Sequence, residues 1–166
     1  MPSIHKDMQE LRRQLQHGSI QRAYRALLRT MTDLRTHFVR RYPTYSFSSL
    51  YPGTFNMTYF ALVPPSLEPH GLKIAVVFNY SAFRFEAWLA ATNRQIQRRT
   101  WQSFKDTRWP GYRVVTPGPG VDSIIECDLA DEFDLTKPEA LTAAIDKKVA
   151  KFTRDIEKAL VHDGGK

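Results

Sequence analysis

The chain has 166 residues, 42% of them hydrophobic, and a formal net charge of +7 at pH 7. This length and composition fit one globular domain with a core of its own and exclude an intrinsically disordered chain. The single cysteine excludes an internal disulfide, and no apolar run approaches the roughly 20 residues that a membrane-spanning helix needs.

Two helices are predicted at the N-terminus. Apolar residues recur at helical spacing from Ile4 to Leu15, and Gly18 can end this helix in a left-handed conformation. Ser19 can cap a second helix that stops at Tyr42-Pro43. The two form a predicted N-terminal helical hairpin. The second helix is too long, and its apolar stripe too wide, for a DNA-reading helix-turn-helix.

From Thr44 to Ala91 the periodicity changes to two, which predicts β-structure. The expected strands lie near residues 45–51, 54–63, 72–80 and 83–90. Short connections such as Pro52-Gly53 join them, so we expect an antiparallel meander.

The next segment predicts a third helix and a further strand. Thr92 and Gln95 form a capping box for a helix that runs to about Asp106. The turn-rich stretch that follows contains a short strand. Residues 121–129 alternate again and predict another strand.

The C-terminal part predicts a long helix, because Thr136 and Glu139 form a second capping box ahead of an extended apolar stripe. Residues 161–166 are expected to be a frayed tail. The whole chain, residues 1–166, is therefore predicted to be one α+β domain. It has a mainly antiparallel sheet of five to six strands, with helices packed on one face.

The strand expected at 83–90 separates into two faces. Phe83, Phe85, Ala87 and Leu89 point one way and should meet the helices. Arg84, Glu86 and Trp88 point the other way. That second face can be solvated, with a weak ion pair. If it is covered, it can form a pocket with an anion donor, a hydrogen-bond acceptor and an aromatic wall.

Other polar residues can border this face. Asn56 and Thr58 would lie beside Arg84 and Glu86 if their strand shares the polar face, although register cannot be read from one sequence. Asn93, Gln97 and the 116–121 loop are expected to border the site from the third helix and its surroundings.

Arg35 falls near the border of the apolar stripe on the second helix. An arginine there can extend its head to water, whereas an inward one needs a carboxylate. We expect an ion pair between Arg35 and either Glu86 or Glu126, linking helix to sheet.

Catalytic signatures are few. Asp122, Glu126 and Asp128 share one strand face and could hold Mg²⁺. The order of elements is similar to the restriction-endonuclease-like core, but that core's acid followed by Glu-x-Lys is absent, because tryptophan stands in the lysine position of Glu86-Ala87-Trp88. The five histidines lack metal-ligand spacing, so no metal or cofactor is expected. Cys127 is predicted to be a packed thiol.

The third helix is basic, with Arg94, Arg98, Arg99 and Lys105 interleaved with Trp101 and Phe104. Arginines with aromatic neighbours can bind phosphates and stack bases. The alternative is a solvated helix that its aromatic residues anchor to the core.

Several motifs in one order carry a resemblance: DLRTHF running into RYP, MTYFAL, LKIAVVF with FRFEAWLA, and GVDSIIE. With these the chain resembles a bacterial family catalogued only as a domain of unknown function. The resemblance implies no reaction, cofactor or active site. It directs attention to Arg35, Arg84, Glu86, Trp88, Asn93, Gln97, Asp122 and Glu126.

The leading hypothesis is a cytoplasmic binding module without catalysis of its own. Its ligand would be small and polar or anionic, or a phosphate-bearing chain, held by Arg84 and stacked on Trp88. The second hypothesis is a metal-dependent nuclease or its relic, using Glu86, Asp122 and Glu126. The third is an interaction subunit whose basic helices meet an acidic partner. No membrane association or secretion signal is expected, and oligomeric state stays open.

Overall fold

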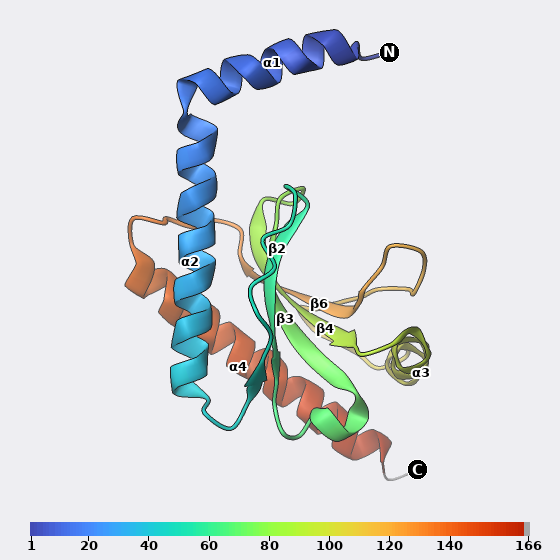
Figure 1. The fold of residues 1–166 in the computed structure, drawn as a ribbon. Helices are drawn as coiled ribbons and strands as arrows, with labels where there is room; N and C mark the ends of the chain where they lie inside the picture. The colour runs from blue at the N-terminus through green and yellow to red at the C-terminus, as the bar shows by residue number, and fades with distance from the viewer. Residues whose placement is uncertain (165–166) are drawn as a thin grey trace.

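The computed structural model describes residues 1–164, which form four α-helices and one six-stranded antiparallel sheet (Figure 1). In chain order the elements are α1 (Ile4–His17), α2 (Ser19–Arg41), β1 (Ser46–Phe47), β2 (Met57–Val63), the 3-10 turn η1 (Glu68–His70), β3 (Leu72–Asn79), β4 (Arg84–Ala91), α3 (Arg94–Phe104), β5 (Arg113–Val114), β6 (Ser123–Ala130) and α4 (Pro138–Asp163). The predicted α+β class, N-terminal helical pair and long C-terminal helix are confirmed.

The strands follow the order β1-β2-β3-β4-β6-β5. The meander predicted from the short connections is present in β2, β3 and β4. The first expected strand, 45–51, is shorter than its pattern suggests. The Ser48 hydroxyl accepts a hydrogen bond from the Ala61 backbone N–H at 2.8 Å. A side chain thus takes the place of a backbone acceptor, and regular pairing stops at Phe47.

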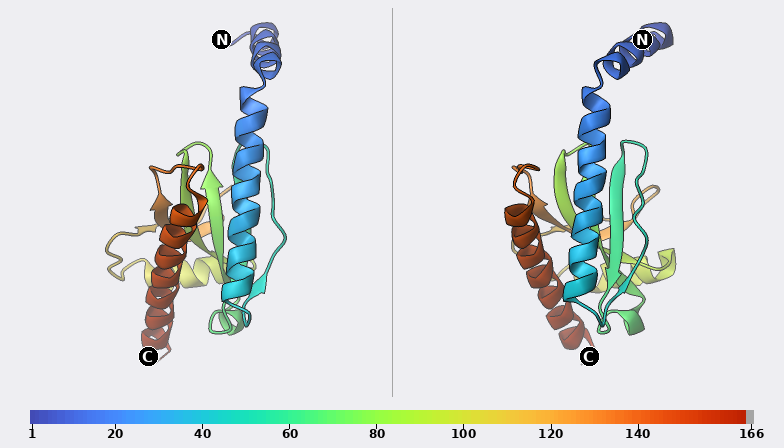
Figure 2. Two further views of the ribbon diagram at one scale, coloured as in Figure 1. Left: turned by 90° about the vertical axis from the view of Figure 1, so that its left-hand side faces the viewer. Right: turned by 60° about the vertical axis from the view of Figure 1, so that its left-hand side comes forward.

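One face of the sheet carries the main core, and α2 and α4 cover it (Figure 2). The phenylalanine side of β4 lies there, as predicted: Phe85, Ala87 and Leu89 are fully buried. The helices contribute their apolar stripes to the same core, with Leu27, Met31, Leu34 and Phe38 from α2 and Ile145, Val149, Phe152 and Ile156 from α4.

The structure corrects one predicted side-chain position on this sheet and decides a second that the sequence left open. Phe83 lies in the turn before β4 with φ of 53° and is 60% exposed, because the strand begins one residue later. Thr58 pairs with Phe78 across β2 and β3, so it lies on the core face, away from Arg84 and Glu86. Asn56 precedes β2 and its side chain accepts a hydrogen bond from the Thr54 N–H.

The helix α3 begins beside the end of β4 and borders the second face of the sheet (Figure 1). Its N-cap is Asn93, one residue after the predicted Thr92, and the Asn93 side chain accepts a hydrogen bond from the Ile96 N–H at 2.8 Å. Gly71 allows α3 to pack closely against the start of β3. It has φ of +66°, and a Cβ there would lie 2.6 Å from the Ile96 side chain.

The start of α4 also differs from the prediction. The hydroxyl of Thr136 donates to Asp134 instead of capping the helix, which begins at Pro138 after Lys137. The helix continues to Asp163, into the predicted tail, and the last two residues of that tail lie outside the described residues.

The helix α1 meets α2 at Gly18, which has φ of 76°, and projects away from the rest of the domain (Figures 1 and 2). None of its residues is buried. Across residues 1–164, no helix combines the length and apolar character needed to cross a membrane.

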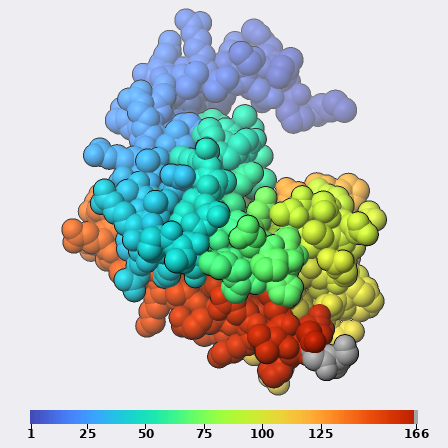
Figure 3. All heavy atoms as spheres, turned by 60° about the horizontal axis from the view of Figure 1, so that its bottom comes forward, coloured from blue at the N-terminus to red at the C-terminus, as the bar shows by residue number. Residues whose placement is uncertain are grey.

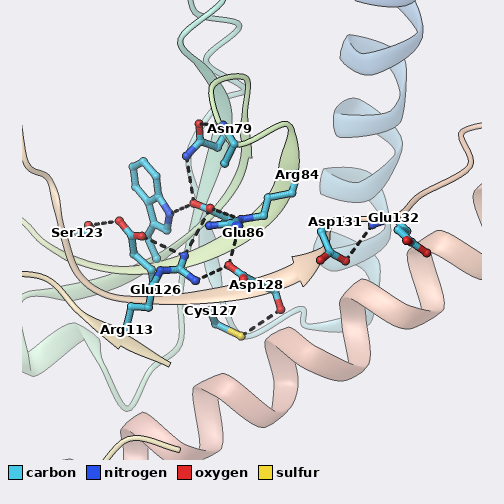
Figure 4. Close-up of polar contacts among 12 residues, drawn as sticks. Asn79, Arg84, Glu86, Arg113, Ser123, Glu126, Cys127, Asp128, Asp131 and Glu132 are labelled. Atoms are coloured by element: carbon cyan, nitrogen blue, oxygen red, sulfur yellow. Dashed lines mark hydrogen bonds and ion pairs between the residues drawn. The ribbon is translucent and has the colours of Figure 1, made fainter. Parts of the chain in front are cut away.

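Cys127 points into the core, with its Sγ 3.6 Å from the Asp128 carbonyl oxygen (Figure 4). Burial raises the pKa of this thiol to about 11. Because the thiolate is the reactive form, we expect an aromatic disulfide reagent to label the native protein slowly at neutral pH and the urea-unfolded protein rapidly. Equal labelling rates in the two states would contradict this placement.

Candidate functional site

The second face of the sheet, opposite α2 and α4, holds the row predicted from β4. In the register, Glu86 pairs with Val77 and Asp128, and Trp88 pairs with Ala75 and Glu126. This face therefore divides into a charged half around Glu86 and an apolar half around Trp88.

Glu86 is the centre of the charged half and is only 1% exposed. Its Oε1 lies 2.7 Å from Arg84 Nε, and its Oε2 accepts a hydrogen bond from the Trp88 indole N–H at 2.7 Å. The side-chain amide of Asn79 donates to the same Oε2 at 3.4 Å (Figure 4). A buried carboxylate needs such partners, because an unpaired charge in the interior is costly.

Arg113 of β5 also belongs to the charged half of this face. The name ion cluster is used below for five residues: Arg84, Glu86, Arg113, Glu126 and Asp128. The Arg113 guanidinium lies 2.7 Å from Asp128, 3.2 Å from Glu126 and 3.5 Å from Glu86. Burial lowers the pKa of Arg113, but its hydrogen bonds to Asp128 and Glu126 outweigh burial and raise it.

Arg84 contacts two carboxylates of the ion cluster through its Nε: Glu86 at 2.7 Å and Asp128 at 3.2 Å. With two guanidinium groups against three carboxylates, the cluster has an excess of one negative charge when all are ionised. This excess negative charge would repel an added anion, so Arg84 is poorly suited to hold the anion of a ligand.

A pocket of about 520 Å³ lies on the other half of this face, beside Trp88. Three strands, the start of α3 and the segment before β6 line this Trp88 pocket: Met57, Tyr59, Lys73, Ala75, Val77, Trp88, Ala90, Ala91, Thr92, Asn93, Arg94, Gln97 and Asp122. Its volume falls within the range of roughly 300–1,000 Å³ that is typical of small-molecule sites.

The walls of the Trp88 pocket are aromatic and the floor is apolar. Trp88 and Tyr59 supply rings, while Ala75 and Val77 supply small side chains between them along β3. Glu86 holds the Trp88 indole N–H, so it fixes the ring that lines the pocket. The ion cluster thus acts as a support for the pocket wall.

The rim of the pocket is polar and carries positive charge. Lys73 is half-buried there, and its side chain has no hydrogen bond or ion pair with any other residue in 1–164. The N-terminus of α3, which has a partial positive charge from its unpaired N–H groups, opens at the same rim.

Gln97 and Arg94 fasten α3 to the segment before β6. The Gln97 side chain is buried, donates to the Val121 carbonyl at 2.9 Å and accepts from Arg94 at 2.8 Å. Arg94 also donates to the Val121 carbonyl and contacts Asp122 at 3.1 Å. These residues position the helix terminus rather than offering free groups to a ligand.

The eight residues singled out from the sequence separate into three sets. Trp88, Asn93, Gln97 and Asp122 line the pocket, and Arg84, Glu86 and Glu126 belong to the ion cluster. Arg35 belongs to neither.

The prediction of a carboxylate partner for Arg35 was wrong. Its Nε donates to the Ser48 carbonyl at 2.7 Å instead. The physical reason is that the sheet separates Arg35 from these carboxylates. α2 packs on the core face, whereas Glu86 and Glu126 project from the opposite face and lie beyond the reach of α2.

Lys73 and Tyr59 are functional candidates that the sequence reasoning missed. A signal for Lys73 was present, because it is the one charged residue of LKIAVVF and lies at an alternate position of a strand. Tyr59 lies on the face of β2 opposite Thr58, and that face was not the one assigned to the site.

The fold and site define an α+β domain with helices on one face of an antiparallel sheet and an aromatic pocket on the other. The chain belongs to the family described as a domain of unknown function (DUF7000), whose model matches residues 4–160. The resemblance inferred from the motifs is thereby confirmed. No curated protein and no solved structure matches the chain.

Proposed function

We propose that this protein binds a small anionic ligand with a planar group in the Trp88 pocket. The observation that carries the proposal is the position of Lys73, a half-buried and unpaired cation at the rim of an aromatic-walled pocket. Removing a lysine from water without a partner is unfavourable, so an anionic ligand would stabilise this arrangement.

The chemistry of the lining supports a two-part ligand. A flat ring or conjugated group would lie against Trp88 and Tyr59, over the small side chains of β3. A carboxylate or phosphate would contact Lys73 and the first turn of α3, where helix N–H groups accept anions well. The anion-holding role expected for Arg84 passes to Lys73 in this proposal.

The observed contacts favour binding over metal-dependent cleavage. Glu86 and Glu126 are paired with arginines, and Asp122 is paired with Arg94 at the pocket rim. Within residues 1–164 no three His, Cys, Asp or Glu side chains converge as a metal-binding group. A cytoplasmic location stays part of the proposal, because a lone buried cysteine suits a reducing compartment.

Thermal-shift assays followed by calorimetry test this proposal. The panel pairs aromatic carboxylates and nucleoside monophosphates with their uncharged analogues, an ester or amide in the first case and the nucleoside in the second. Anionic members should raise the unfolding temperature and their uncharged counterparts should not. A panel in which no anion binds, or in which charge makes no difference, would overturn the proposal.

A further inference from the structure

The helix α1 carries an apolar stripe that nothing in residues 1–164 covers. Ile4, Met8, Leu11 and Leu15 are 76%, 56%, 48% and 45% exposed. In the space-filling view of Figure 3, the N-terminal helix stands out from the body of the molecule. This stripe is separate from the Trp88 pocket.

A helix as short as α1 is only marginally stable in water while its apolar stripe stays exposed. Its 14 residues form a helix in which no residue is buried. Isolated helices shorter than about 12–15 residues are marginal in water, because nucleation is unfavourable and most helix stability comes from packing. The ion pair between Glu10 and Arg13, at 2.6 Å on the surface, adds little. A packing partner would supply the missing stability.

The spacing of the stripe is that of a coiled-coil seam. The intervals from Ile4 to Leu15 are four, three and four residues, the alternation that the a and d positions of a heptad repeat show. In heptad terms Met8 and Leu15 take the a position, and Ile4 and Leu11 take the d position. A partner that fits this seam is another helix.

The flanking charges identify the helix that fits. Asp7 precedes an a position and Arg12 follows a d position, and both are exposed and unpaired within residues 1–164. In a parallel pair of identical helices, residues at these g and e positions of successive heptads face each other across the seam. Asp7 of each copy would then meet Arg12 of the other, giving two symmetric ion pairs.

The antiparallel alternative fits less well. It places the two e positions together, so that His5 of one copy faces Arg12 of the other, with no carboxylate between them. A membrane surface also fits less well, because the polar side of α1 mixes acidic with basic residues rather than presenting a basic face.

We propose that α1 is an association helix that pairs in parallel with α1 of a second copy of this chain. The seam is only two heptads long, so the pairing is reversible and depends on protein concentration. This arrangement covers the stripe without altering the core face or the Trp88 pocket.

Analytical ultracentrifugation of the full chain, from low micromolar to near-millimolar concentration, tests the proposal. The wild type should move from monomer toward dimer. Leu11→Asp places a charge in the seam and should weaken association by about tenfold or more. The matched control Gln9→Asp, on the outer side of the same helix, should associate like the wild type. Circular dichroism checks that each variant keeps its folded body.

A charge exchange tests the parallel arrangement. Asp7→Arg alone and Arg12→Asp alone each place like charges across the seam and should associate more weakly than the wild type. An equimolar mixture of the two variants restores both opposite-charge pairs and should form a heterodimer more strongly than either variant associates alone.

Three results would overturn the proposal. The first is a wild type that stays monomeric at every concentration. The second is a Leu11→Asp variant that dimerises as the wild type does. The third is a monomeric wild type that sediments with phosphatidylserine vesicles through Leu11, which would assign the stripe to a membrane surface.

Discussion

The Glu86→Ala variant is expected to lose about 3 kcal/mol or more of unfolding free energy. The change removes a carboxylate that is 1% exposed, takes away the acceptor of the Trp88 indole N–H and leaves Arg84 Nε with Asp128 alone. Breaking a buried ion pair from one side is destabilising, because the groups that remain lose a partner that water does not replace. Urea denaturation followed by circular dichroism measures the change.

Glu132→Ala is the matched control for this effect. Glu132 is exposed, and its side chain makes no hydrogen bond or ion pair within residues 1–164, so its removal should change stability by less than about 0.5 kcal/mol. If the Glu86 variant unfolded at the same urea concentration as this control, the ion cluster would not be the structural support described above.

The second large effect is expected on binding. For an anion that the panel identifies, Lys73→Ala should weaken affinity by about 10- to 100-fold, because a charge-assisted contact contributes roughly 1.5–3 kcal/mol. The stability of the free protein should hardly change, since Lys73 makes no ion pair within residues 1–164. Isothermal titration calorimetry measures the affinities.

Lys148→Ala serves as the control, because Lys148 is an exposed lysine of α4, on the far side of the sheet. It removes the same formal charge without touching the pocket, and its affinity should match the wild type. Equal losses in the two variants would mean that the anion responds to overall charge rather than to Lys73.

The two faces of β4 could be predicted because burial alternates along a strand. Phe85, Ala87 and Leu89 had to share one environment, and Arg84, Glu86 and Trp88 another. The same reasoning failed for Phe83, since a two-residue period applies only inside the strand. Where the turn ends depends on pairing with β3, which a single sequence does not show.

The composition of the site was harder to predict, because it depends on which strands are neighbours. The pairing of β4 with β6, and of β6 with β5, brings Arg113 to Glu86 from 27 residues further along the chain. Only this pairing shows that Arg84 is already neutralised. Lys73 lies at the pocket because β3 places it there. It is a candidate because its side chain has no partner within residues 1–164, and the spacing of residues in a sequence does not reveal this.

The helix residues illustrate the same limit. Asn93 and Gln97 line the Trp88 pocket, and their side chains cap α3 and fasten it to the segment before β6. The partner of Arg35 was predicted wrongly. Its position at the border of the apolar stripe shows the direction in which the side chain leaves the helix, but it does not show which face of the sheet the helix packs on.

The most direct test of the central claim is an NMR titration of the three tryptophan indole N–H signals with an anion from the panel. The signal of Trp88, assigned with a Trp88→Phe variant, should shift, because Trp88 lines the pocket. The signals of Trp101 and Trp109 should stay, because neither lines it. A titration that shifted Trp101 and left Trp88 unchanged would place the ligand on the basic helix surface and contradict the account.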